Sequence, residues 1–248
     1  MPLFGPRHRD GDLIALEGLD LRLRVNPRAR RISLRLDPAT GEALAVAPSA
    51  ARLGDAVRFA RERGDWLAAQ LARRPRPQPL SPGATLAVLG ETWRLVPDGR
   101  RPHLAGPAPD GVRTLRGCGA EAVDPGLVRR VVKREALDVF VARAERHCRS
   151  LGLTEAPPLS LIDARTRWGS CTPAQAGREA RIRLSWRLAL APLAVADYVV
   201  AHECAHLREA NHGPAFWRLV RDLVGDERPS RAWLREHGLA LKAQLPLT

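Results

Sequence analysis

The run HECAHLREANH at residues 202–212 constrains the fold more than any other feature, because it holds three histidines that a straight helix cannot bring together. Residues four apart on an α-helix differ by about 40° in azimuth and about 6 Å in rise, so the imidazoles of His202 and His206 can chelate one ion. If the helix continued, His212 would lie about 9 Å further along the axis. The chain must therefore turn back, and Asn211 is the expected pivot because asparagine tolerates the left-handed conformation that ends helices.

The same run predicts a chemistry. Glu203 directly follows the first histidine, where its carboxylate can reach a metal-bound water and take its proton. Three imidazoles hold Zn²⁺ at roughly 2.0 to 2.1 Å and leave the fourth tetrahedral position open, as in a catalytic site. A helix with a polar, solvent-facing side is the alternative. The apolar residues before the motif, including Val199 and Val200, argue against it, since unpaired polar groups on a buried face are costly.

Composition bounds the class of protein. The chain has 248 residues, 45% of them hydrophobic, which is enough for one large domain or two small ones with cores of their own. The N-terminal region has no apolar run typical of a signal peptide, and no stretch approaches the roughly 18 apolar residues that span a bilayer. We therefore expect a soluble, cytoplasmic protein without a membrane partner. Four scattered cysteines without a CxxC pair argue against a disulfide framework and a cysteine zinc ribbon.

The formal net charge of +13 raises the question of a nucleic-acid partner, because lysine and arginine neutralise phosphates. Of the 40 basic residues, only Lys133 and Lys242 are lysines. Such a bias towards arginine, beside abundant alanine, glycine and proline, indicates the base composition of the gene as much as function. Nucleic acid is therefore the less favoured partner, although it stays open.

The first part of the chain, 1–75, is predicted to be a small β-rich unit with a closing helix. Residues 19–25 and 30–36 alternate apolar and charged side chains with period two, the pattern of half-buried antiparallel strands. A turn is expected at 38–41, and helical periodicity over 50–71.

The next part, 76–124, is predicted to be a proline- and glycine-rich linker with a short strand pair. Four prolines and no apolar period make 73–83 a linker or an exposed extended segment. The strand pair is expected at 84–90 and 92–97, and an irregular surface region at 98–119.

The remainder, 125–248, is predicted to be the catalytic domain. Its expected elements are, in order, a helix over 125–151, strands over 159–163 and 180–190, the metal-site helix from Pro192, and two helices that begin near Pro214 and Pro229. This order is the minimal architecture of a zincin. The predicted fold class is thus α+β, in which a small antiparallel β-rich unit precedes a zincin-like domain with helices packed on a small sheet.

Several spaced motifs together closely resemble one family. They are RTRWGSC at 165–171, LSWRLALAP at 184–192, DYVVAHECAHL at 197–207 and NHGPAFW at 211–217. The chain resembles the YgjP-like metal-dependent hydrolases, a bacterial family of predicted zinc metallopeptidases related to SprT-like and WLM domains, over nearly its whole length. The resemblance implies zinc on the three histidines and Glu203 as general base, the roles that geometry also gave. The ligand spacing matches that of metzincins as well, but Glu209 replaces their glycine and no Met-turn is apparent.

Further site residues are less determined by the sequence. Candidates to stabilise the transition state are Tyr198, Arg167 and the backbone amides of 169 and 170. A core role is favoured for Tyr198. For Arg167, a role in the site and a role in a salt bridge are equally favoured. Ligand histidines usually donate their other ring nitrogen to a carboxylate or carbonyl, and the acidic candidates for this partner are Asp197, Glu209, Asp222 and Glu236.

The leading functional hypothesis is a zinc metallopeptidase that uses a zinc-bound water activated by Glu203 on a peptide or protein substrate. The peptide would lie beside an edge strand, for which 180–186 is the expected candidate. The first alternative is a metal-dependent nucleotide pyrophosphohydrolase, an activity also suggested for some YgjP-like proteins, which the arginine excess would suit. The second is a DNA-associated protease like the SprT-like proteins. The sequence contains no zinc knuckle or helix-turn-helix signature to favour the second.

Overall fold

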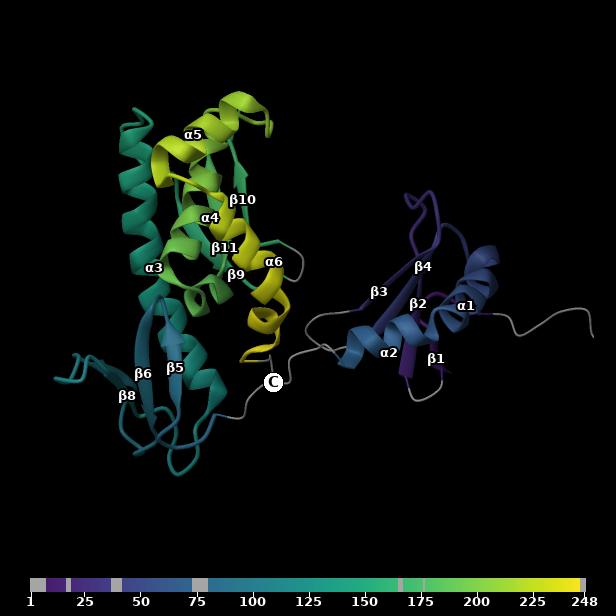
Figure 1. The fold of residues 1–248 in the computed structure, drawn as a ribbon, viewed down its shortest axis with the longest axis horizontal. Helices are drawn as coiled ribbons and strands as arrows, with labels where there is room; N and C mark the ends of the chain where they lie inside the picture. The colour runs from purple at the N-terminus through teal and green to yellow at the C-terminus, as the bar shows by residue number, and fades with distance from the viewer. Residues whose placement is uncertain are drawn as a thin grey trace, which may run out of the picture. The chain divides into compact units, whose positions relative to one another are not determined.

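A computed structural model describes residues 8–16, 19–36, 42–72, 80–164, 167–175 and 177–245. The chain divides into two compact units, Met1–Arg76 and Pro77–Thr248, coloured purple to blue and blue-green to yellow in Figure 1. Each unit has a hydrophobic core of its own. None of the helices in the described ranges combines the length and apolarity that crossing a membrane requires.

The first unit is a four-stranded sheet with helices against it. Its elements are β1 (Leu13–Leu16), β2 (Leu19–Val25), β3 (Ser33–Leu36), β4 (Ala43–Ala47), a 3-10 turn (Ala50–Arg52), α1 (Leu53–Glu62) and α2 (Gly64–Ala72). The strand order is β1-β2-β4-β3, and β2 pairs with β4 in parallel, whereas an antiparallel unit was expected. The reason is that β3 pairs on the far side of β4, which leaves β2 and β4 as neighbours. The helix expected over 50–71 is interrupted at Arg63, and the turn expected at 38–41 lies outside the described residues.

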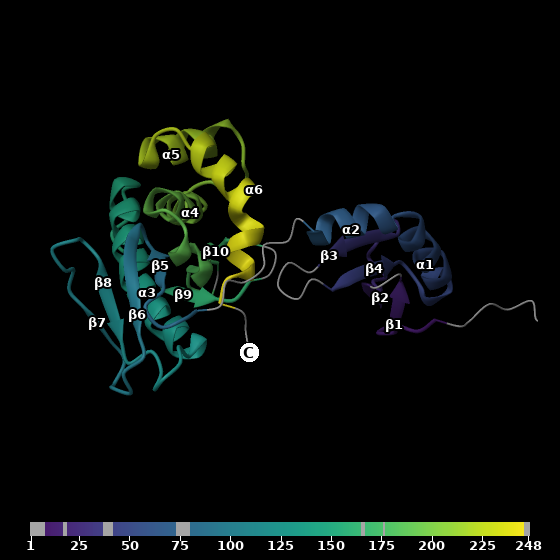
Figure 2. The same cartoon turned by 60° about the horizontal axis from the view of Figure 1, so that its bottom comes forward.

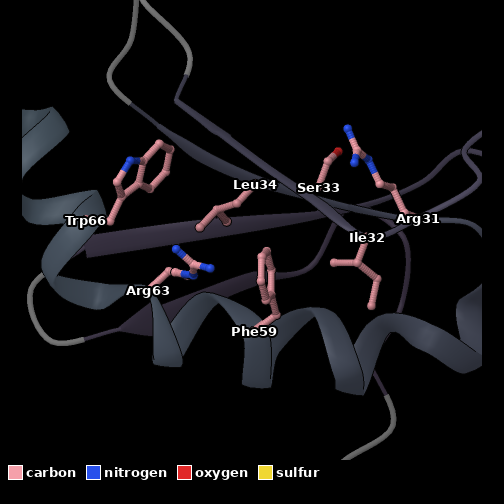
Figure 3. A pocket seen from close by; sticks show the side chains of 7 residues that line it. All are labelled: Arg31, Ile32, Ser33, Leu34, Phe59, Arg63 and Trp66. Carbon is pink, nitrogen blue, oxygen red and sulfur yellow. The ribbon is translucent and has the colours of Figure 1, made fainter.

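The core of this unit follows from the alternation in β2. Leu21 and Leu23 are fully buried together with residues of β4 and α1. The edge strand β3 is less completely covered, and a cavity of about 420 Å³ lies beside it. Figure 3 shows this cavity between Leu34 of β3 and the side chains of Phe59, Arg63 and Trp66, the last of which is exposed.

The second unit begins with another four-stranded sheet. Its strands are β5 (Thr85–Val88), β6 (Glu91–Val96), β7 (His103–Ala105) and β8 (Arg113–Arg116), in the order β5-β6-β8-β7. The expected strand pair is present as β5 and β6. The expectation of an irregular region over 98–119 was wrong, because β7 and β8 are strands too short to show a recognisable period-two pattern. Residues of this sheet share one hydrophobic core with the helices that follow, and most of the linker expected at 73–83 lies outside the described residues.

The rest of the second unit carries the HExxH helix. Its elements are α3 (Pro125–Ser150), β9 (Leu159–Ile162), β10 (Gly169–Thr172), β11 (Arg181–Ser185), a 3-10 helix (Trp186–Leu190), α4 (Leu193–Ala205), α5 (Pro214–Val224) and α6 (Arg228–Ala243). The four predicted helices are confirmed, and prolines lie in the first turns of α3, α5 and α6, where the missing N–H costs nothing. The structure also confirms the α+β class. Helix α4 packs against α3, α5, α6 and β10, so it is the central helix (Figures 1 and 2).

The small sheet of this half differs from the prediction in two ways. The strand expected over 180–190 ends at Ser185, because the next five residues are all buried and form a 3-10 helix, which an alternating pattern does not distinguish from a strand. A further strand, β10, lies between the two expected strands in the chain and begins at Gly169, within the motif RTRWGSC. The sheet order is β10-β11-β9, so β11 is central and cannot be the peptide-binding edge expected at 180–186. Strand β10 is at an edge.

Candidate metal centre

Three histidines from α4 and the segment after it converge on one point. His202 lies in the last turn of α4, His206 is the residue that ends this helix, and His212 lies just before α5. One ligand nitrogen from each lies within 4.8 Å of the others, and the Nε2 atoms of His202 and His212 are 3.1 Å apart. Nδ1 of His206 donates to the backbone carbonyl of Glu209 at 3.0 Å, which leaves its Nε2 free to bind an ion.

The chain reverses as the ligand spacing requires, but not at the expected residue. Helix α4 ends in a turn that begins at His206, in which the amide of Arg208 donates to the carbonyl of Ala205 at 3.0 Å. Asn211 is not left-handed, since the described non-glycine residues with positive φ are Leu89 and Leu245. A distant segment stabilises this turn, because the Arg208 guanidinium donates to the carbonyl of Leu151, just after α3, at 2.8 Å. This tether makes a left-handed pivot unnecessary.

Aromatic side chains of α5 support the imidazoles. Phe216 is fully buried, and its ring centroid lies 4.5 Å from that of His206 and 4.7 Å from that of His212. The ring of Trp217 stacks on His212 with centroids 5.8 Å apart. Helix α5 begins at Pro214, two residues after His212. Its aromatic side chains therefore restrict the orientation of the ligand rings.

The protonation state of the histidines suits a metal. Burial, with further contributions from His206 and His212, lowers the pKa of His202 to about 3, and burial also lowers the pKa of His206. Both rings are therefore neutral at neutral pH, the form in which imidazole binds metals. Nδ1 of His202 is buried without a hydrogen-bond partner among the described residues. Three imidazole nitrogens with no thiolate in the set fit zinc with an open coordination position.

The side chain of Glu203 extends from α4 towards the edge strand β10. It is 5% exposed, and the backbone amide of Cys171 donates to its carboxylate. A Cβ atom at Gly169 would come within 2.4 Å of its Oε1, so only glycine leaves room for the carboxylate at this position of the strand. Burial raises the pKa of Glu203 to about 7, although the Cys171 amide and the Arg167 guanidinium oppose this rise. A carboxyl group with such a pKa is suited to exchange a proton near neutral pH.

The two other predicted site residues differ in their surroundings. Tyr198 is buried in the core, one turn before His202, with ring centroids 5.9 Å apart. Burial raises the pKa of its phenol. Arg167 is exposed and forms no ion pair with a described residue, but its charge acts on Glu203. The surroundings of Tyr198 favour packing, and those of Arg167 favour the site over a salt bridge.

The carboxylate partner expected for a ligand histidine is replaced by a carbonyl. Asp197 instead binds Arg143, Arg146 and His147 of α3. Glu209 takes part through its backbone oxygen only, and no contact of Asp222 or Glu236 with the ligands occurs within the described residues. The sequence suggested the backbone amide of Gly169 as a site group, but not its close packing against Glu203, because only the pairing of β10 with β11 places Gly169 beside α4.

Comparison with known proteins adds one match. A family model described as YgjP-like, metallopeptidase domain, matches residues 30–237, well over half of the chain. Searches of curated proteins and of solved structures give no match. The matched range contains the three histidines, Glu203 and both strands that flank β11.

Proposed function

Because the chain belongs to the YgjP-like metallopeptidase family and is thus a metal-dependent hydrolase, we propose that it is a zinc peptidase with Glu203 as general base. One observation carries this proposal. Three imidazoles converge within 4.8 Å beside a buried carboxyl group whose pKa is about 7. A purely structural zinc site needs no such carboxyl group, and it usually has four protein ligands.

The residues of the chain divide the work as follows. His202, His206 and His212 hold the ion, and the hydrogen bond from His206 to the Glu209 carbonyl fixes one ring. Zinc held by these histidines would supply Lewis-acid chemistry to the scissile carbonyl and to the attacking water. Glu203, positioned by the Cys171 amide, accepts a proton from the attacking water and passes it to the leaving amine.

Arg167 is the proposed stabiliser of the negative charge that develops on the carbonyl oxygen. Its guanidinium is exposed, unpaired among the described residues and close enough to act on Glu203. A preorganised cation at the reacting carbonyl lowers the barrier because it meets the charge as it forms. The same unpaired cation would suit a phosphate, which keeps a nucleotide pyrophosphohydrolase as the second candidate function.

The edge strand β10 is the proposed binding site for an extended peptide. It is the sheet edge nearest to Glu203, as the Cys171 contact demonstrates, whereas β11 is enclosed between two strands. Extended peptides commonly add to such an edge as a further strand. A peptide that runs along β10 would pass the carboxylate that activates the water.

The test compares zinc-loaded wild type with Glu203→Gln on a peptide library, with pyrophosphate release from nucleoside triphosphates measured in parallel. We expect wild type to cleave peptides and Glu203→Gln to lose at least about 100-fold in kcat with its zinc retained. Glu145→Gln is the matched control, because this exposed glutamate of α3 undergoes the same charge change outside the site. Full zinc occupancy without peptide cleavage by wild type would refute the peptidase, and release of pyrophosphate would favour the second candidate.

A further inference from the structure

A cavity of about 570 Å³ lies in the second unit, where three parts of the catalytic half meet. Its lining includes Leu153 after α3, Pro158 before β9, Pro173 after β10 and Leu207 after α4. Two of these lining residues lie next in the chain to parts of the metal centre. Leu207 directly follows the ligand His206, and Pro173 directly follows the strand whose Cys171 amide holds Glu203.

The cavity begins where β10 ends, because Pro173 lines it and directly follows this strand. Strand residues advance by about 3.3 Å each, so Pro173 lies about 7 Å along the chain from Cys171. We infer that a peptide whose scissile bond lies at Glu203 and that runs along β10 directs a side chain one or two residues away towards this end of the cavity. The cavity is thus positioned to determine which peptides are cut.

The lining combines an apolar wall with two carboxylates. Leucine, proline and alanine side chains form most of the wall, and Glu155 and Glu179 line it with exposed carboxylates. Neither glutamate forms an ion pair or hydrogen bond with any described residue. Other carboxylates of the unit, such as Asp163 and Asp197, pair with arginines. In a chain with a net charge of +13, these two carboxylates thus have no paired cation among the residues that the structure describes.

We propose that this cavity makes the enzyme selective for substrates with a lysine or arginine beside the scissile bond, an inference that rests on the proposed peptidase function. The aliphatic stem of such a side chain would pack on the apolar wall, and its cationic head would lie between Glu155 and Glu179. A leucine would gain only the apolar contact. A glutamate would be repelled, which adds discrimination against acidic peptides.

The test uses matched peptides that carry lysine, arginine, norleucine or glutamate at each position flanking the scissile bond. For wild type we expect kcat/KM to be about tenfold higher with lysine or arginine than with norleucine at one position. The double variant Glu155→Gln/Glu179→Gln should remove this ratio through a fall in kcat/KM for the lysine and arginine peptides, and an unchanged unfolding midpoint in calorimetry shows that the fold is intact. The charge-reversed pair Glu155→Arg/Glu179→Arg should favour glutamate, whereas the control Glu145→Gln should behave as wild type.

A binding measurement separates this inference from the proposed function. Zinc-loaded Glu203→Gln is titrated with the same fluorescent peptides, so that no turnover is needed. Tighter binding of lysine than norleucine peptides, lost in the triple variant with Glu155→Gln and Glu179→Gln, supports the cavity even if wild type cleaves nothing. Equal binding of all peptides, or a lysine preference that survives in the triple variant, overturns it.

Discussion

Gly169 leaves no room for a side chain beside the Glu203 carboxylate. A Cβ atom there would lie 2.4 Å from Oε1 and 2.7 Å from Cγ of Glu203. We therefore expect Gly169→Ala to displace the carboxylate and to lower kcat by about 10- to 100-fold, because small misplacements of a catalytic group are costly. Zinc content should stay unchanged, since the histidines do not depend on this contact.

Steady-state kinetics and zinc analysis check this prediction. Gly106→Ala is the control, because a Cβ atom at that glycine meets nothing within 4 Å and its φ is not positive. An equal loss of activity in both variants, or wild-type activity in Gly169→Ala, would contradict the assigned role of Gly169.

The sequence predicted the metal ligands but not the packing of Gly169 against Glu203. His202 and His206 were predictable because helix geometry alone brings residues four apart together. His212 was predictable because the ligand set requires a reversal, yet the place of the turn was not, since the Arg208 tether to Leu151 comes from a distant segment. The close packing of Gly169 against Glu203 could not be predicted, because it depends on the register of β10 against β11.

Among the elements, one partly buried carboxylate joins α3 to the HExxH helix. Asp197 accepts from His147 at 2.7 Å, from Arg146 at 2.9 Å and from Arg143 at 3.0 Å. Burial alone would raise the pKa of Asp197, but His147 and the two arginines outweigh it and hold the pKa below 3.8. The ionised carboxylate therefore stabilises the packing of α3 on α4.

We expect Asp197→Asn to lower the free energy of unfolding by about 2 to 3 kcal/mol at neutral pH. Since the folded pKa is depressed, this contribution is present above 3.8 and is lost as the pH falls through the folded pKa. Urea unfolding of the metal-free proteins should thus show a difference that narrows below pH 3.8. A difference that widens in acid would contradict this explanation.

The elements themselves were predictable to different degrees. The four long helices of the second unit were found because apolar periodicity and N-terminal prolines mark them over many residues. Strands β7 and β10 have three and four residues, too few for a recognisable period, and their partners come from elsewhere in the chain. The peptide edge was misplaced for this reason, because strand order is a tertiary property.

At the scale of the whole molecule, the two units have separate cores. The first is built on β2, β4 and α1, and the second extends from Leu86 to Leu245. The metal ligands belong to the second unit alone. We therefore expect two transitions in calorimetry of the zinc-loaded chain, with a chelator lowering the midpoint of only one of them.

The Asp197→Asn variant assigns the transitions, because it should lower the midpoint of the same transition that the chelator affects. If the chelator shifts both transitions equally, or if only one transition is seen, the two units unfold together. Either result would contradict the expectation that each unit unfolds cooperatively by itself.

The proposed function depends most on three imidazoles that hold zinc and leave one position open. X-ray absorption at the zinc edge of the reconstituted protein measures this directly. We predict three imidazole nitrogens and one oxygen at about 2.0 to 2.1 Å, with one nitrogen lost in His212→Ala. Sulfur at about 2.3 Å, or four protein ligands with no oxygen from water, would contradict a catalytic site built from His202, His206 and His212.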